Sequence, residues 1–261
     1  MSDETLDDFS WSAGDLLFSP PHLNAAGAMG FYPDSGSLVD LGILGAFVTN
    51  PISLSPRHPA QGRCCQVYPG GFLLHTGHPN PGLRRALKRY AARWERSHLP
   101  VIVHLMVQPH ENLASMVQSL EGVEGLAGIE ISLPLDAGPD LVRSAASASF
   151  GKLPVIVRLP VDRALELASS ALEGGAAAVS LGPPRGALPG EGDHWIRGRL
   201  YGPALFPFAL EVVHRLVKRN DPVIGAGGVY HLEQASAMIQ AGAMAVQFDA
   251  GLWSGNFWRE K

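Results

Sequence analysis

Eight short apolar runs rich in β-branched residues recur between residues 23 and 248, and helical patterns separate most of them. Runs such as Val101-Ile102-Val103 lack alternation, which is typical of parallel strands buried on both faces. Strands joined by helical crossovers predict an α/β fold, a (β/α)8 TIM barrel. An open doubly wound sheet is the alternative, and eight strands in so short a chain favour closure. The expected strands are residues 23–26, 45–50, 100–107, 128–133, 154–159, 177–181, 222–225 and 245–248.

The expected helices are residues 81–97, 111–120, 163–173, 203–219 and 232–241, and two irregularities interrupt the pattern. A long insert after strand two, residues 51–82, is rich in Pro, Gly and His and predicts a loop or a hairpin over the barrel mouth. The chain after strand eight is too short for a full helix, so the eighth helix is truncated. We expect residues 6–18 or a second subunit to cover the gap. The predicted organisation is an N-terminal segment, residues 1–19, that packs on or caps one barrel domain, residues 20–261.

Composition narrows the class of protein. The net charge of -4 and the pI near 6.2 argue against nucleic-acid binding. The two cysteines, Cys64 and Cys65, are adjacent, which disfavours a disulfide and indicates a reducing compartment. No apolar run reaches the roughly 18 residues of a membrane span. Residues 1–8 are acidic and lack the features of a signal peptide, so we expect a cytoplasmic protein without a membrane contact.

Basic residues crowd the expected helix 81–97. A solvated outer face of the barrel is the simple interpretation, and an acidic protein partner or nucleic acid is the alternative. The negative net charge argues against nucleic acid. The basic residues are Arg84, Arg85, Lys88, Arg89, Arg93 and Arg96.

Several short segments, in order along the chain, carry a resemblance to a known family. Asn24-Ala25-Ala26-Gly27 stands in the first expected strand, and Gly225-Ala226-Gly227-Gly228 stands at the end of the seventh. With these segments in this order, the chain resembles the dihydroorotate dehydrogenase family, most of all its soluble class. The other matching segments are residues 30–31, 45–49, 54–57, 77–82, 198–204 and 242–247.

The resemblance implies an FMN cofactor at the carboxyl ends of the strands, where sites form in such barrels. It implies a phosphate at Gly227-Gly228, where glycine lets backbone N–H groups approach an anion. A plain tight turn is the alternative interpretation of this pair. The positions that the resemblance assigns to the cofactor are Ala25, Ala26, Gly27, Thr49, Asn50, His104, Glu130, Arg158, Gly202, Gly227, Gly228, Asp249 and Ala250.

The chain departs from the family pattern where catalysis would occur. The resemblance implies a cysteine or serine base at position 133, and the residue there is Leu133. A leucine cannot accept a proton, and a base typically contributes about 10²–10⁴ in rate. We therefore assign no catalytic residue and expect no appreciable dihydroorotate oxidation; Glu130 is the remaining candidate for a base. The other departures are Asn50, Leu74, His104, Glu130, Leu135, Arg158, Pro183 and Pro184.

Asp249 affects whether FMN can bind, because the resemblance implies a glycine next to the phosphate at this position. A carboxylate ~4 Å from a phosphate costs on the order of 4 kcal/mol per unit charge at an effective dielectric of 20. An outward Asp249, or a pair with an arginine such as Arg199, would relieve this repulsion. Arg158 could replace the family lysine beside the flavin. The sequence leaves FMN or no cofactor as the two possibilities.

His104, Glu130 and Arg158 lie at matching points of three successive strands. If they point inward, we expect a Glu130–Arg158 ion pair with His104 to fill space that a flavin once occupied, since interior charges must be paired. A new catalytic site based on Glu130 is the alternative. His75 and His78 with His104 raise the possibility of a metal, but His-x-x-His in a loop is not specific, and we predict none.

Two classes of function follow. The first is a barrel that has lost the orotate site and the base, a pseudoenzyme that binds a ligand or a partner. The second is an FMN-dependent oxidoreductase acting on another substrate. We expect a small-molecule or anionic ligand at the mouth, and assembly into a homo-oligomer or with another protein.

Overall fold

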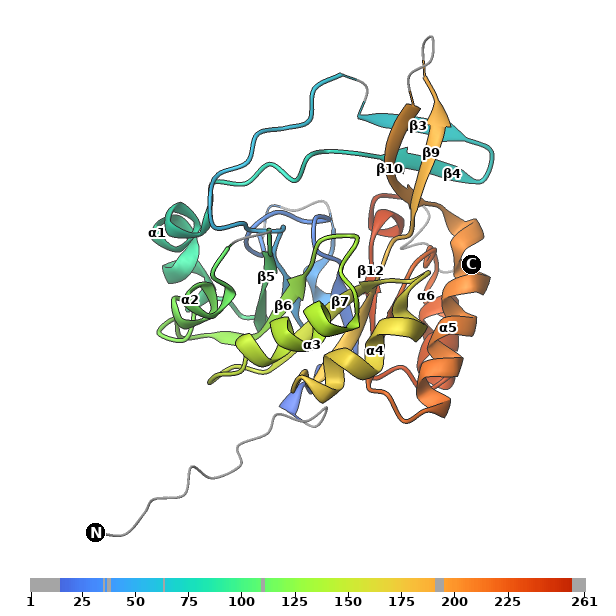
Figure 1. Cartoon of the computed structure of the whole chain (residues 1–261). Helices are drawn as coiled ribbons and strands as arrows, with labels where there is room; N and C mark the ends of the chain where they lie inside the picture. Colours follow the sequence, from blue (N-terminus) through green and yellow to red (C-terminus); the bar gives the residue numbers. More distant parts are fainter. Residues whose placement is uncertain are drawn as a thin grey trace, which may run out of the picture.

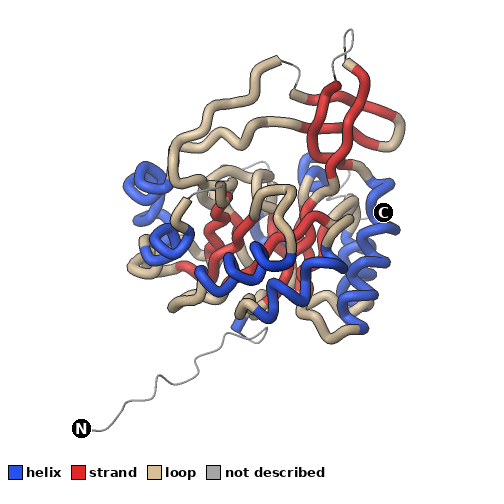
Figure 2. The backbone as a smooth tube through the Cα atoms, viewed as in Figure 1, coloured by secondary structure: helices blue, strands red, loops and turns tan. Residues whose placement is uncertain are grey.

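The computed structural model describes residues 15–254 except 35, 37, 38, 63, 109, 110 and 191–194. Its centre is an eight-stranded parallel sheet in the order β1-β12-β11-β8-β7-β6-β5-β2, seen in Figures 1 and 2. All eight expected strands are present. They are β1 (His22–Asn24), β2 (Phe47–Val48), β5 (Val101–Met106), β6 (Leu126–Ser132), β7 (Val155–Pro160), β8 (Ala178–Gly182), β11 (Val223–Ala226) and β12 (Ala245–Phe248).

The sheet closes on itself between β1 and β2. A parallel bridge joins Leu23 to Ala46. Beyond it, the Asn24 side chain replaces the missing ladder: its Nδ2 donates to Val48 O at 2.6 Å and its Oδ1 accepts from Val48 N at 2.9 Å. Both edges of the sheet are therefore satisfied, and the predicted (β/α)8 barrel is confirmed over an open sheet.

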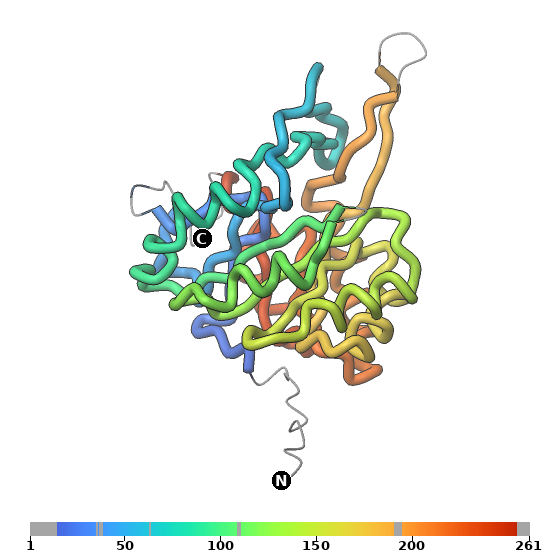
Figure 3. Tube along the Cα trace, turned by 60° about the vertical axis from the view of Figure 1, so that its left-hand side comes forward, coloured from blue at the N-terminus to red at the C-terminus, as the bar shows by residue number. Residues whose placement is uncertain are grey.

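Helices pack around the outside of the barrel (Figure 3). One of them, α3, was not expected from the sequence. Its buried residues, Val142, Ala145 and Ala146, recur at i, i+3 and i+4 but are mostly small, so its apolar stripe is weak in the sequence. The helices are α1 (Leu83–Trp94), α2 (Leu113–Gln118), α3 (Pro139–Ala148), α4 (Ala164–Glu173), α5 (Phe206–Lys218) and α6 (Leu232–Gln240), and short 3-10 turns form η2 (Leu41–Ile43), η3 (Pro203–Leu205) and η4 (Ala250–Trp253).

A second, antiparallel sheet stands over one end of the barrel (Figures 1 and 2). The long insert supplies the hairpin β3 (Cys65–Tyr68) and β4 (Gly71–Leu74), as one of the two expected forms. A second hairpin, β9 (Arg185–Pro189) and β10 (Trp195–Tyr201), pairs with it in the order β3-β4-β10-β9. This hairpin was not among the expected strands, because exposed strands with Gly and Pro give little apolar periodicity. This second sheet, which we call the cap sheet, covers the carboxyl ends of the barrel strands.

Gly202 shows how closely the cap approaches the barrel loops. Its φ is +149°, and a Cβ there would lie 2.2 Å from the carbonyl oxygen of Gly70. The position therefore requires glycine for packing alone.

The opposite end of the barrel is closed by the chain before β1. Leu16 is 2% exposed and belongs to a cluster of inward residues that includes Leu23, Ile102 and Ile156. The outer face of β12 is buried without it, because Phe248 packs in the same cluster as Leu252 of η4. Leu16 therefore lies under the barrel and not over the gap of the eighth helix. Residues 6–14, which we also expected at this gap, lie outside the described residues.

Candidate functional site at the barrel mouth

Glu130 is the centre of a fully buried polar layer inside the barrel. Parallel pairing of β5 with β6 sets His104 beside Glu130, and their side chains meet at 2.5 Å between Nδ1 and Oε2. Ser180 Oγ donates to Glu130 Oε1 at 2.6 Å, and Gln247 Nε2 donates to the same oxygen at 2.7 Å. The expected grouping of His104 with Glu130 is confirmed, while Ser180 and Gln247 were not anticipated.

The charges in this layer follow from its hydrogen bonds. Burial alone would raise the pKa of Glu130, but its hydrogen bond with His104, then the charge of Arg158 and the bond from Ser180, hold that pKa below its usual range. Burial lowers the pKa of His104 despite its carboxylate partner. A neutral His104 fits the geometry: Nδ1–H donates to Glu130, and Nε2 lies 2.8 Å from the Ser132 hydroxyl, which can donate to it. Glu130 is thus ionised and saturated with donors.

Arg158 links this layer to the mouth, where the strands end. Its Nη1 is 3.7 Å from Glu130 Oε2 and donates to Ala26 O at 3.5 Å. The expected Glu130–Arg158 pair is therefore present, with His104 as the closer partner. The side chain of Arg158 is 11% exposed and borders a cavity of about 180 Å³. The other lining residues are Ala25, Ala26, Gly27, Ala28, Phe72, Leu74, Tyr201, Asp249, Ala250 and Trp253.

A second cavity of about 160 Å³ adjoins the first and contains Arg199 of the cap sheet. The two cavities share four lining residues, Ala26, Gly27, Leu74 and Tyr201, so they are parts of one mouth. The guanidinium of Arg199 contacts His78 Nε2. Burial, then the charge of Arg199, lowers the pKa of His78 to about 2, and burial lowers the pKa of Arg199 to about 10. At neutral pH, His78 is neutral and Arg199 is charged.

Asp249 faces the first cavity from the end of β12. It is 8% exposed, and no arginine pairs with it within the described chain. Burial raises its pKa to about 6, while backbone N–H groups of Ala250 and Gly251 and the charge of Arg158 lower it less. We expected Asp249 either to turn outward or to pair with an arginine such as Arg199, and neither arrangement occurs. The backbone at the start of η4 holds the carboxylate inside.

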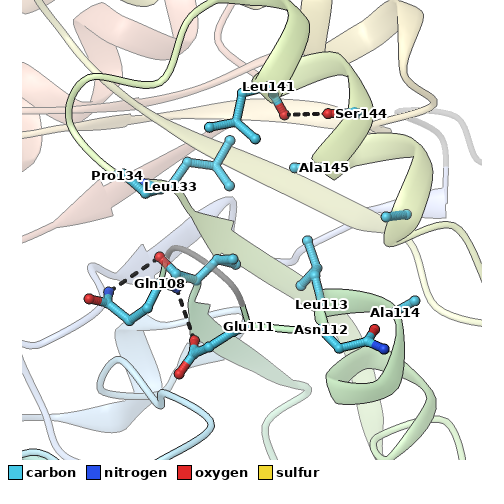
Figure 4. A pocket seen from close by; sticks show the side chains of 12 residues that line it. Gln108, Glu111, Asn112, Leu113, Ala114, Leu133, Pro134, Leu141, Ser144 and Ala145 are labelled. Atoms are coloured by element: carbon cyan, nitrogen blue, oxygen red, sulfur yellow. Dashed lines mark hydrogen bonds between the residues drawn. The ribbon is translucent and has the colours of Figure 1, made fainter.

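Leu133, at the position of the family base, follows β6 and lines a groove between α2 and α3 instead of either mouth cavity. The groove has a volume of about 370 Å³ and is shown in Figure 4, where Leu133 and Leu141 approach one another. Its polar groups bond locally, as when Gln108 N donates to Glu111 Oε2 at 2.9 Å. Leu133 itself offers no proton acceptor, and the carboxylate of the groove, Glu111, accepts from the backbone of Gln108.

The other predicted site residues divide between the mouth and the framework. Asn50 borders the second cavity, and its Oδ1 accepts from Gly30 N at 3.0 Å. Thr49 is buried and fixes β5, since its Oγ1 accepts from His104 N at 3.0 Å. Gly228 has φ +69°, and a Cβ there would lie 2.4 Å from Phe206 N, so packing against α5 already requires glycine. Neither mouth cavity includes Gly202, Gly227 or Gly228.

The metal hypothesis can be compared with the same geometry. His75 is exposed, while His78 contacts Arg199 and His104 contacts Glu130. Within the described residues, no three side chains of His, Cys, Asp or Glu are grouped to hold a metal. In the same part of the chain, none of the helices has the length and apolar character needed to cross a membrane.

Comparisons with known proteins place this chain among its relatives. The family model described as dihydroorotate dehydrogenase matches residues 191–261. A putative dihydroorotate dehydrogenase A (fumarate) of Aeropyrum pernix is 32% identical, over 93% of this chain and 86% of the relative. The chain belongs to the dihydroorotate dehydrogenase family. The catalytic subunit of dihydroorotate dehydrogenase B (NAD(+)) from Maridesulfovibrio salexigens is also similar, 29% identical over 94% of this chain and 87% of the relative.

Within the dihydroorotate dehydrogenase family, the mouth of this chain has an altered set of charges. The family pattern expects asparagine where His104 and Glu130 form the buried layer, and lysine where Arg158 stands. Arg199 and Tyr201, which line the mouth, are set by the unexpected hairpin β9–β10. Sequence reasoning noted Arg199 but missed Tyr201, because only the cap sheet brings them over the barrel. Whether the thirteen predicted positions contact a cofactor stays a prediction.

Proposed function

We propose that this dihydroorotate dehydrogenase-like barrel is a pseudoenzyme that binds a small anionic ligand at its mouth and does not oxidise dihydroorotate. The observation that supports this proposal most directly is the position of Arg199 in the mouth. Arg199 is a partly buried cation in a cavity, it contacts the neutral His78, and no carboxylate pairs with it among the described residues. A cation removed from water without a counter-charge is destabilising, and a bound anion would offset this cost. Arg158, on the adjoining cavity, adds a second cation.

Two features support the proposal that the chain does not oxidise dihydroorotate. Leu133 offers no base and lines the groove between α2 and α3. Glu130 is the only other candidate that we considered, and it is fully buried with its carboxylate bonded to His104, Ser180 and Gln247. A carboxylate whose pKa is held below its usual range is a poor proton acceptor, and it is enclosed by side chains.

The residues present do not fit FMN at its phosphate end. Asp249 is buried beside Arg158, where its carboxylate would oppose a phosphate on the end of β12. Gly227 and Gly228, where the resemblance implies a phosphate, line neither mouth cavity. The ligand that we propose carries a carboxylate or phosphate that Arg199 and Arg158 can bind.

An FMN-dependent oxidoreductase acting on another substrate is the second candidate. Membership of the family favours it, as does the position of Ala25, Ala26 and Gly27 beside Arg158 in the mouth. Purified protein, before and after incubation with FMN, separates the candidates. Visible flavin absorbance that remains after desalting, with ordinary turnover of dihydroorotate, would refute the first proposal. Absorbance without turnover of dihydroorotate would favour the second.

Ligand binding is tested by thermal unfolding in the presence of small carboxylates and inorganic phosphate. A ligand at 100 times its Kd should stabilise the folded chain by about 2.7 kcal/mol. The Arg199→Gln variant should lose this protection. Arg197→Gln is the matched control, because Arg197 lies on the same strand but is exposed and lines neither cavity. Equal protection of Arg199→Gln, or no protection of the parent by any of the anions, contradicts an anion site at the mouth.

We also propose a cytoplasmic location and an assembly with a second copy or another protein. The two cysteines, Cys64 and Cys65, are free, which suits a reducing compartment. Large apolar side chains are exposed on the outer helices, such as Phe208 on α5 and Leu141 on α3. Cell fractionation tests the location, and light scattering of the purified chain tests self-association.

A further inference from the structure

A groove separate from the mouth runs beside α1 on the outside of the barrel, with a volume of about 910 Å³. It exists because the connection from β1 to β2 contains only the three-residue η2 in its described part, where a full helix would otherwise cover the flank of α1. The groove is lined by Tyr32, Pro33, Leu41, Gly42, Arg89, Ala92, Arg93, Arg96, Ser97, His98 and Leu99.

The lining of this groove is basic, and none of its described residues carries a carboxylate. Arg89, Arg93 and Arg96 are spaced at i, i+4 and i+7, so they lie on one face of α1 and its last turn. In the described structure, none of these three arginines makes an ion pair with an acidic residue. His98 adds a further donor at the end of the groove. The positive charge is therefore not used to hold the fold together.

Two of these arginines are held in place by aromatic rings. The Arg93 guanidinium lies 4.3 Å from the centre of the Tyr32 ring, and Arg89 lies 5.3 Å from that of Tyr90. Tyr32 and Tyr90 stack on each other at 5.8 Å. Stacked guanidinium groups keep their N–H edges free, and their ordering before binding lowers the entropy cost of holding an anion.

We propose that this groove is a second anion site, which binds a small molecule carrying several phosphate groups. Its volume lies within the roughly 300–1,000 Å³ of small-molecule sites. Arginine forks match phosphate oxygens in two-bond geometry. The carboxyl end of a helix repels anions, so the phosphates lie beside Arg89 and Arg93 rather than beyond Arg96.

Two observations favour a small polyphosphate over a protein partner or a nucleobase. None of the groove residues is a large, exposed apolar side chain, so the groove offers charge and hydrogen bonds for recognition rather than an apolar anchor. Tyr32 stacks with Arg93 and with Tyr90, so its ring faces are already engaged and offer no free platform for a base. The recognition chemistry that remains is that of phosphate groups.

The test is calorimetric titration of the full chain with inorganic tripolyphosphate at about 0.1 M ionic strength. The double variant Arg89→Gln/Arg93→Gln should weaken binding by about tenfold or more. Arg84→Gln/Lys88→Gln is the matched control: it removes the same charge with the same spacing from α1, but outside the groove lining, and should change the affinity by less than about twofold. Both double variants are also titrated in the Arg199→Gln background, which removes the proposed mouth site; the loss of affinity from Arg89→Gln/Arg93→Gln should be the same there, which separates this groove from the mouth.

Three outcomes overturn the proposal. The parent shows no binding of tripolyphosphate; the two double variants lose affinity equally, which indicates unspecific attraction to a basic helix; or a poly-glutamate peptide binds more tightly than tripolyphosphate, which indicates an acidic protein partner. Circular dichroism of each variant confirms that the helices are retained before affinities are compared.

Discussion

Two polar regions lie one above the other in this barrel, and they differ in how their charges are paired. In the inner layer, Glu130 is surrounded by donors, including His104 at 2.5 Å and Ser180 at 2.6 Å, and all three residues are buried. In the mouth, Asp249 is buried and Arg199 is partly buried, yet no residue of opposite charge forms an ion pair with either in the described structure.

The difference separates structural polarity from polarity that a ligand can use. A buried charge with an opposite charge beside it stabilises one arrangement and resists change, whereas one without a counter-charge raises the free energy of the folded state. Natural barrels place such charges where ligands enter. We therefore interpret the inner layer as a filled core and the mouth as the binding region, and the following variants test this contrast.

The largest effect should come from the inner layer. Glu130→Ala leaves His104, Ser180 and Gln247 without their shared acceptor and Arg158 without its counter-charge. We expect a loss of about 3–5 kcal/mol in the free energy of unfolding, measured by urea denaturation. Glu130→Gln keeps one acceptor oxygen and should lose less. A loss below about 1 kcal/mol for Glu130→Ala would mean that the layer is solvated and not a packed core.

In the mouth, replacing the charge of Asp249 should raise the free energy of unfolding instead of lowering it. Its pKa is raised to about 6 from 3.8, so the folded chain holds a proton that the unfolded chain releases, and stability falls as pH rises from about 4 to about 6. Asp249→Asn removes this loss and should be more stable than the parent at pH 7, by up to roughly 3 kcal/mol. The two should be equally stable below pH 4. Denaturation across this pH range tests the sign, and the exposed Asp140→Asn serves as the control.

The same titration should couple to the ligand. Protonation of Asp249 removes a negative charge beside Arg158, so small anions should bind the mouth more tightly at pH 5 than at pH 7. Asp249→Asn should bind with equal affinity at both values. Binding that weakens on acidification would place the anion away from Asp249.

A smaller effect is expected at Arg199 in the ligand-free chain. Arg199→Met replaces an unpaired cation by an apolar side chain of similar length, so stability should be unchanged or rise by about 1 kcal/mol. The contrast with Glu130→Ala is the point of the test, since both remove a buried charge. A loss of more than about 2 kcal/mol would show that the contact of Arg199 with His78 stabilises the fold and that Arg199 is not held ready for a ligand.

The barrel was predictable because its strands carry their own signal. Continuous apolar runs such as Val155-Ile156-Val157 indicate strand positions, and the number of strands favours closure over an open sheet. The cap hairpin β9–β10 was not predictable, because half-exposed strands with Gly186 and Gly198 lack both periodicity and a core face. Helix α3 was missed for a related reason: its buried face is made of small residues.

The site could be predicted from the sequence only where its residues lie on neighbouring strands of the barrel. His104 and Glu130 follow from the alternation of their strands, and their contact follows from parallel register. Gln247, whose Oε1 has no hydrogen-bond partner among the described residues, lies far along the chain and joins Glu130 only through barrel closure. Tyr201 lies at the mouth because of the cap sheet, which was not predicted from the sequence.

The smallest effect is expected from restoring the family base. Leu133→Ser supplies a hydroxyl at the position where the family has cysteine or serine, yet we expect no turnover of dihydroorotate with added FMN above the parent. The side chain at 133 lines the groove between α2 and α3 in Figure 4, and Glu130 remains locked to His104 below the mouth. A base contributes about 10²–10⁴ in rate only when it lies within hydrogen-bond reach of the substrate. Turnover gained by this single substitution would mean that the substrate and the flavin still bind in the old place, and that the mouth had lost only its proton acceptor; its absence, with anion binding intact, would separate the two regions as the geometry does.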